Sequence, residues 1–143
     1  MVAGITAARL SAKWATEGAL KQRWSERKEK AYAEIVEALY DIILFCDLAE
    51  VEYMKMNERD NPKMADYRSK YSEAYLKIQR ATDIGAFVIS DDSVSILSDL
   101  RKRPTLDWNK NPPWEIYEEE SRHFHDALAA IMRCAKHDLK YSK

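Results

Sequence analysis

The stretch that decides the fold is residues 28–56, KEKAYAEIVEALYDIILFCDLAEVEYMKM, which contains neither proline nor glycine. A period near 3.6 places side chains at alternating intervals of three and four on one face of an α-helix. Val36 and Ile43 widen this face to the breadth that a bundle helix needs. The stretch therefore predicts one long wall of a helical core. The apolar side chains at this spacing are Tyr32, Ile35, Leu39, Ile42, Cys46, Ala49, Tyr53 and Met56.

The same helix is predicted to extend upstream and to cover about residues 5–58. Leu10, Trp14, Leu20 and Trp24 continue at helix-compatible spacing, and Gly18 marks the place where a bend is expected. A straight helix of this length would span about 80 Å at 1.5 Å per residue. The helices that follow are too short to cover it, so the excess must bend back, fray or find a partner.

Three further helices are predicted downstream. Pro62 suits the first position of a helix that runs to about residue 88, and Ser90 suits the N-cap of a short helix that ends near Arg103. Asn111-Pro112-Pro113 opens a fourth helix. No segment keeps a strand period. The sequence therefore predicts an all-α, antiparallel bundle of about four helices: a long first, a long second, a short third and a long fourth. The expected seam of the first two helices includes Ile35, Leu39, Ile42, Tyr71, Ala74 and Ile78.

The composition is that of a single globular domain. Of 143 residues, 46% are hydrophobic and 33% are charged, and the net charge is −1. The longest aliphatic and aromatic run, Ile42 to Phe45, is far shorter than the roughly 20 residues of a membrane span. The two cysteines, Cys46 and Cys134, lie in separate helical stretches, which favours reduced thiols over a disulfide or a zinc site. A cytoplasmic protein is therefore expected.

Charge is unevenly distributed along the chain. Residues 1–30 hold seven basic and three acidic residues, a balance of +4, so the remainder carries −5. We predict a basic helical arm over residues 1–24 and a helical-bundle domain over residues 25–143. Large apolar side chains in this basic segment indicate an interaction surface. The predicted interaction residues are Trp14, Leu20 and Trp24.

Three kinds of partner could cover this arm. The favoured one is a second copy of the chain, in a dimer whose arm lies against an acidic surface near Glu115, Glu118 and Glu119. The second is an anionic membrane surface, contacted through residues 1–30. Nucleic acid is an unlikely partner, because the rest of the chain is acidic.

Chemistry-bearing motifs are few. Glu120 and His123 have the Glu-x-x-His spacing of carboxylate-bridged di-iron bundles, but a second such pair is missing and His123 points away from the core face. They are weak metal candidates only, and a solvated charged face is the preferred interpretation. The tyrosines Tyr67, Tyr71 and Tyr75 leave open a pocket for an apolar small molecule. No metal, cofactor or catalytic residue is predicted, and the chain is not expected to be an enzyme.

The chain resembles a known class of proteins in three short stretches. These are Gln22 to Tyr32, running into the KxxAYAEIVEALYD pattern of Lys28 to Asp41; Ile89-Ser90-Asp91-Asp92; and Ala135 to Leu139. It is similar, over roughly residues 20–140, to bacterial helical-bundle proteins found as cytoplasmic domains after a transmembrane anchor. Proteins of this type also occur on mobile gene cassettes. The resemblance implies a bundle without an assigned activity. A full span is missing at the N-terminus, so the chain would begin after an anchor or be a free relative.

These observations together predict a non-enzymatic helical interaction or scaffold module that self-associates. Two alternatives stay open. One is a membrane-proximal cytoplasmic domain, membrane-associated in a longer native form. The other is a ligand- or metal-binding helical bundle with possible enzymatic activity.

Overall fold

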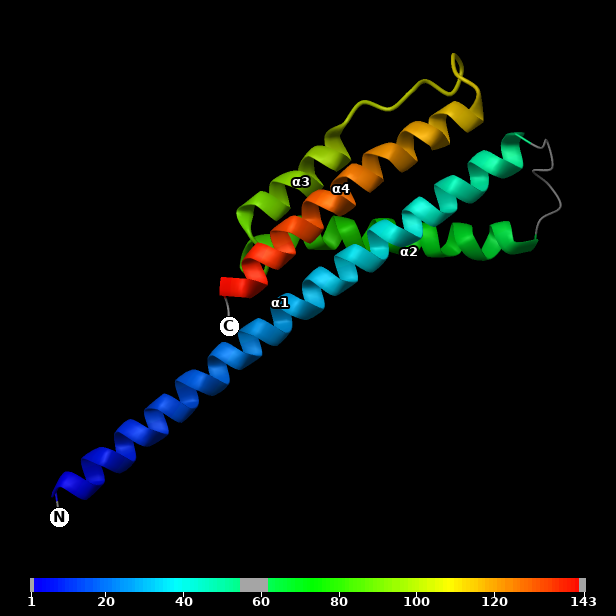
Figure 1. The fold of residues 1–143 in the computed structure, drawn as a ribbon. Helices are drawn as coiled ribbons and strands as arrows, with labels where there is room; N and C mark the ends of the chain where they lie inside the picture. The colour runs from blue at the N-terminus through cyan, green and yellow to red at the C-terminus, as the bar shows by residue number, and fades with distance from the viewer. Residues whose placement is uncertain (1, 55–61, 142–143) are drawn as a thin grey trace.

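The computed structural model describes residues 2–54 and 62–141, and helices are the only regular secondary structure within these ranges. The predicted all-α bundle is confirmed, with a long first helix, a short third and a long fourth (Figure 1). The elements in chain order are α1 (Val2–Met54), α2 (Pro62–Ile84), a 3₁₀ turn η1 (Gly85–Phe87), α3 (Asp91–Lys102) and α4 (Pro113–Tyr141).

Helix α1 begins at Val2, earlier than the predicted start, and passes Gly18 without the expected bend (Figure 1). A Cβ at Gly18 would meet no atom within 4 Å, so no neighbour presses on the helix there. A glycine weakens a helix interior by less than about 1 kcal/mol, which does not break it. The predicted end near residue 58 falls in the range 55–61, outside the described residues.

The later helix boundaries follow their capping residues. Pro62 is the first residue of α2, and Pro113 is the first residue of α4, where a proline costs no hydrogen bond. Ser90 caps α3, because its side chain accepts a hydrogen bond from the Ser93 backbone N–H at 3.2 Å. Helix α2 ends at Ile84, earlier than predicted, and the η1 turn carries the chain round to α3.

The core forms where α1 packs against both α2 and α4, with α3 against α4. Figure 1 shows α2 and α4 running back along α1, with α2 crossing it obliquely. The predicted seam of α1 and α2 is confirmed, although Tyr71 is only partly buried in it. The side chains that the core buries most completely include Leu39, Ile42, Ile43, Ile78, Leu97, Phe124 and Ile131.

A polar network ties α1 to the bundle at the point where the rest of the helix projects away. The Tyr32 hydroxyl donates to Asp138 Oδ2 at 2.8 Å and lies 3.0 Å from Ser93 Oγ. Lys28 Nζ lies 3.3 Å from Asp138 Oδ1. Upstream of this network, α1 extends alone beyond the other helices (Figure 1). The predicted division between residues 24 and 25 therefore falls inside one continuous helix. No helix in the described ranges combines the length and apolarity needed to cross a membrane.

Candidate functional site

The first part of the candidate site is the projecting part of α1, residues 2–27, which reaches three residues beyond the end of the arm predicted over residues 1–24. We call residues 2–27 the arm from here on. Leu20 and Trp24 lie one turn apart on it, so they share one helix face. Their side chains are 49% and 47% exposed. The side chain of Trp14, the third predicted interaction residue, lies outside the described residues. The structure thus places two of the three predicted residues on an apolar stripe that residues 2–54 and 62–141 leave about half exposed.

Basic side chains surround this stripe. Lys21, Arg23 and Arg27 are all exposed. The guanidinium carbon of Arg27 lies 5.6 Å from the centre of the Trp24 ring, within cation–π range. These three cations outnumber the exposed Glu17 and Glu26, so the arm presents an apolar stripe on a mainly positive surface.

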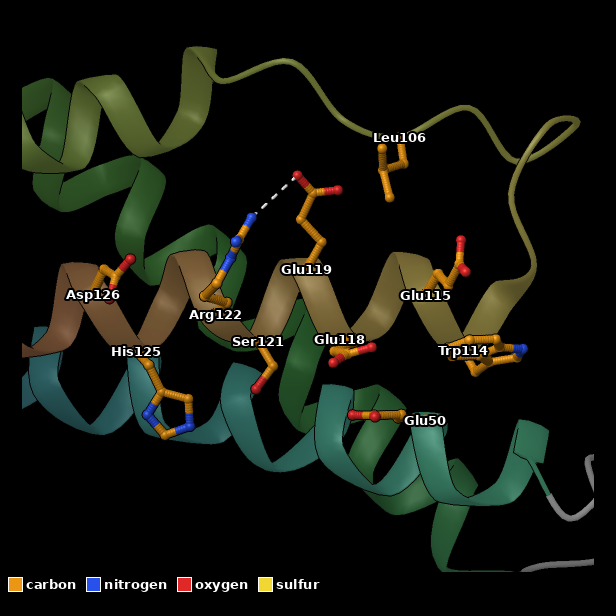
Figure 2. Close-up of a pocket in the computed structure, with 10 residues that line it drawn as sticks. All are labelled: Glu50, Leu106, Trp114, Glu115, Glu118, Glu119, Ser121, Arg122, His125 and Asp126. Carbon is orange, nitrogen blue, oxygen red and sulfur yellow. Dashed lines mark ion pairs between the residues drawn. The ribbon is translucent and has the colours of Figure 1, made fainter.

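The second part of the candidate site is a cleft of about 800 Å³ on the outer side of α4, which we call the acidic cleft. Figure 2 shows Glu118, Ser121 and His125 pointing from α4 toward α1, where Glu50 faces them. Glu115, Glu119 and Asp126 lie on the other side, with Leu106 above them. The structure thus brings the three acidic residues of the predicted docking surface into one concave region. The cleft is lined by Glu50, Leu106, Trp114, Glu115, Glu118, Glu119, Ser121, Arg122, His125 and Asp126.

The acidic cleft has an excess of negative charge. Five carboxylates line it, against the single guanidinium of Arg122, which lies 3.5 Å from Glu119 Oε1. Partial burial raises the pKa of Glu50 first, and the nearby charges of Glu118 and Asp47 raise it further. Like charges crowded in this way attract a cationic partner, which would relieve their repulsion.

Glu120 and His123 do not form a common site. His123 Nε2 lies 3.5 Å from Glu119 Oε1, whereas the Glu120 carboxylate pairs with Arg103 at the end of α3. Among the described residues, no group of three or more His, Cys, Asp or Glu side chains could hold a metal ion. The prediction of a solvated charged face was wrong for Glu120, whose side chain is only 15% exposed. Its partner Arg103 lies at the end of α3, and the periodicity of the α4 sequence does not predict which residue of another helix pairs with Glu120.

The pair of Arg103 and Glu120 sits in an apolar setting. The guanidinium carbon of Arg103 lies 4.9 Å from the centre of the Phe124 ring, and the Tyr75 hydroxyl donates to Glu120 Oε2 at 3.5 Å. Burial disfavours the charge of Arg103, but Glu120 and Tyr75 together outweigh this effect and raise the arginine pKa. Sequence reasoning missed this pair. The available signal was that Glu120 lies three residues after Tyr117 and four before Phe124, next to the core face.

A scan against models of protein families gives no match to the chain, and neither curated proteins nor solved structures show a significant similarity to it. The case for a function therefore rests on the residues of the arm and of the acidic cleft.

Proposed function

We propose that the protein is a non-enzymatic helical interaction module that self-associates through its arm. The observation that carries the proposal is the half-exposed apolar stripe of Leu20 and Trp24 on a helix that extends beyond its own bundle. Exposed apolar surface of this kind is typical of interaction sites. A second copy of the chain can cover it in a closed, symmetric dimer, because each copy offers both an arm and a surface to receive one.

The acidic cleft of the second copy is the proposed receiving surface. The arm holds five basic and two acidic residues, a balance of +3, and the cleft offers five carboxylates. Trp114 and Leu106 add apolar surface against which an arm carrying Leu20 and Trp24 can pack. A helix seated in a groove through both apolar and charged contacts is a common mode of protein recognition. The electrostatic contribution to self-association would decrease as the salt concentration increases.

Light-scattering mass at tens of micromolar protein tests self-association. The intact chain is expected at about twice its 16.7 kDa, and a chain lacking residues 1–20 at the monomer mass. Trp24→Glu should also give a monomer while keeping the full length. Tyr40→Glu is the matched control, since Tyr40 is an equally exposed aromatic residue of α1 outside the arm, 53% exposed. A monomeric intact chain would remove the proposal.

A membrane-proximal role is the second candidate, supported by the exposed Trp24 among Lys21, Arg23 and Arg27. An amphipathic basic helix with tryptophan can lie on an anionic bilayer surface. Sedimentation with vesicles containing anionic lipid, but not with neutral vesicles, would favour this candidate if the intact chain is monomeric. In either case we infer a cytoplasmic location, which the two unpaired cysteines Cys46 and Cys134 support.

A further inference from the structure

A second concave site lies on a different face of α4 from the acidic cleft. This cavity of about 480 Å³ opens between α2, α4 and the loop that joins α3 to α4. Five aromatic rings from four segments of the chain line it, and we call it the aromatic pocket. The rings belong to Phe45 on α1, Tyr71 and Tyr75 on α2, Trp108 on the loop and Tyr117 on α4.

The rings of the aromatic pocket hold one another in place. The Phe45 ring centre lies 4.5 Å from that of Tyr71 and 5.8 Å from that of Tyr117. Tyr71 and Tyr75 are in contact at 4.9 Å. These separations are those of favourable tilted and edge-to-face aromatic pairs. The pocket therefore has walls formed before any ligand arrives.

Trp108 is the least buried of the five rings, with 54% of its surface exposed, although it packs edge-on against Tyr117 at 5.6 Å. The loop that carries it contains hydrogen bonds between its own residues. The Asn109 backbone N–H donates to Asp107 Oδ1 at 2.9 Å, and the Asn111 backbone N–H donates to the Asp107 carbonyl at 3.0 Å. An Asx turn of this kind presents the tryptophan at the pocket, where a flat ligand would bury more of it.

The charge at the aromatic pocket is positive. Two charged side chains line it, Glu120 and Arg68, and the charge of Glu120 is balanced by Arg103. Burial raises the pKa values of Tyr71 and Tyr75, so both hydroxyls stay protonated at neutral pH. Arg68 is exposed, and none of the ion pairs among residues 2–54 and 62–141 involves it. Its guanidinium is therefore available to a ligand.

We propose that the aromatic pocket binds a flat aromatic molecule that carries an anionic group. Its ring would lie among the five aromatic side chains, and its carboxylate or sulfonate would pair with Arg68, whose planar fork suits such anions. Aromatic faces also attract cations, but the positive charge of Arg68 opposes a cationic ligand. The site shares none of its lining residues with the acidic cleft, so the proposal stands apart from self-association.

Nuclear magnetic resonance titration of the ¹⁵N-labelled chain tests the proposal. The probes are 2-naphthoate, the neutral 2-naphthylmethanol and the cationic (2-naphthylmethyl)trimethylammonium. The indole N–H signal of Trp108, assigned through Trp108→Phe, should shift saturably with 2-naphthoate, while that of Trp24 stays in place. Arg68→Gln should weaken 2-naphthoate binding about fivefold, the strength of a solvent-exposed ion pair, and leave the neutral probe unaffected. Arg122→Gln in the acidic cleft is the matched control and should change neither.

Several results would overturn the proposal. One is a Trp108 signal that does not move at millimolar 2-naphthoate. The proposed pairing of the anionic group with Arg68 would be wrong if the anionic and neutral probes bound equally. It would also be wrong if Arg68→Gln left the affinity for 2-naphthoate unchanged. Tighter binding of the trimethylammonium probe would show a cation site instead. Because Arg68 and Arg122 are both exposed, neither substitution is expected to disturb folding.

Discussion

Glu120 and Arg103 form an ion pair inside the bundle, with side chains that are only 15% and 11% exposed. The pair joins α4 to the C-terminal end of α3, and it fixes the start of the loop that carries Trp108. Stacking of Arg103 on Phe124 places this contact against the core. The two charges depend on each other, because removal of either leaves the other buried without compensation.

Glu120→Ala should therefore destabilise the protein strongly, by about 3–5 kcal/mol in the free energy of unfolding. Urea denaturation followed by circular dichroism measures it. Glu119→Ala is the matched control: its partners Arg122 and His123 are more exposed to solvent than Arg103, and the loss of these contacts should cost less than about 1 kcal/mol. Replacing both buried partners, as Arg103→Met with Glu120→Leu, should recover most of the loss. Equal costs for Glu120→Ala and Glu119→Ala would contradict the structural role of the buried pair.

Leu39→Ala should cost about 2–5 kcal/mol, because Leu39 has no exposed surface and lies at the seam of α1 and α2. The same denaturation experiment measures the change. Leu76→Ala removes an identical side chain from α2 that is 58% exposed, and it should alter stability by less than about 0.5 kcal/mol. If Leu39→Ala also lowered the free energy of unfolding by less than about 0.5 kcal/mol, the assignment of Leu39 to the seam of α1 and α2 would be wrong.

The stability of the protein should fall at alkaline pH, partly because of Cys46. Burial, and then the charges of Glu120 and Asp47, raise the pKa of this thiol from 9.0 to about 12. Below pH 9 the thiol is protonated in both the folded and the unfolded chain, so its contribution to stability is complete. Above pH 9 the unfolded chain loses this proton and the folded chain retains it. Stability should therefore decrease by about 1.4 kcal/mol per pH unit from this group until the pH approaches 12.

Urea denaturation at pH 8, 9.5 and 10.5 measures this slope. Cys46→Ala should make it shallower, with the remainder due to Tyr71 and Tyr75, whose pKa values are also raised. Cys134→Ala, which leaves the buried thiol in place, should retain the full slope. A slope that is the same in all three proteins would show that Cys46 does not determine the alkaline loss.

The sequence predicted the fold well because local rules decided it. The uninterrupted spacing from Tyr32 to Met56, the proline at position 62 and the Ser90 cap each act within one or two helical turns, so their structural consequences could be predicted from the sequence. The expected bend at Gly18 was wrong because a single glycine lowers helix stability without breaking the helix. The exposure of Leu20 and Trp24 also followed from the length of α1 compared with its neighbours.

The acidic cleft and the aromatic pocket were harder to predict because they combine distant segments. Glu50 on α1 faces Glu118 on α4. The contact between Trp108 and Tyr117 depends on the path of the loop that joins α3 to α4. Periodicity assigns a side chain to a helix face but does not identify its partner on another element. Glu120 shows this limit: its position beside the core face was visible, whereas the charge that allows its burial comes from Arg103.

The most direct test of self-association through the arm is a charge exchange between the arm and the acidic cleft. One variant carries Lys21→Glu, Arg23→Glu and Arg27→Glu. The other carries Glu115→Lys, Glu118→Lys and Glu119→Lys, so that two carboxylates and four cationic groups line its cleft. Each variant has an arm and a cleft of the same sign, so each should be a monomer by sedimentation equilibrium. When the two are mixed, both arm-to-cleft contacts pair opposite charges. The account predicts a dimer of about twice 16.7 kDa in the mixture. Dimers in either variant alone, or a mixture that stays monomeric, would contradict it.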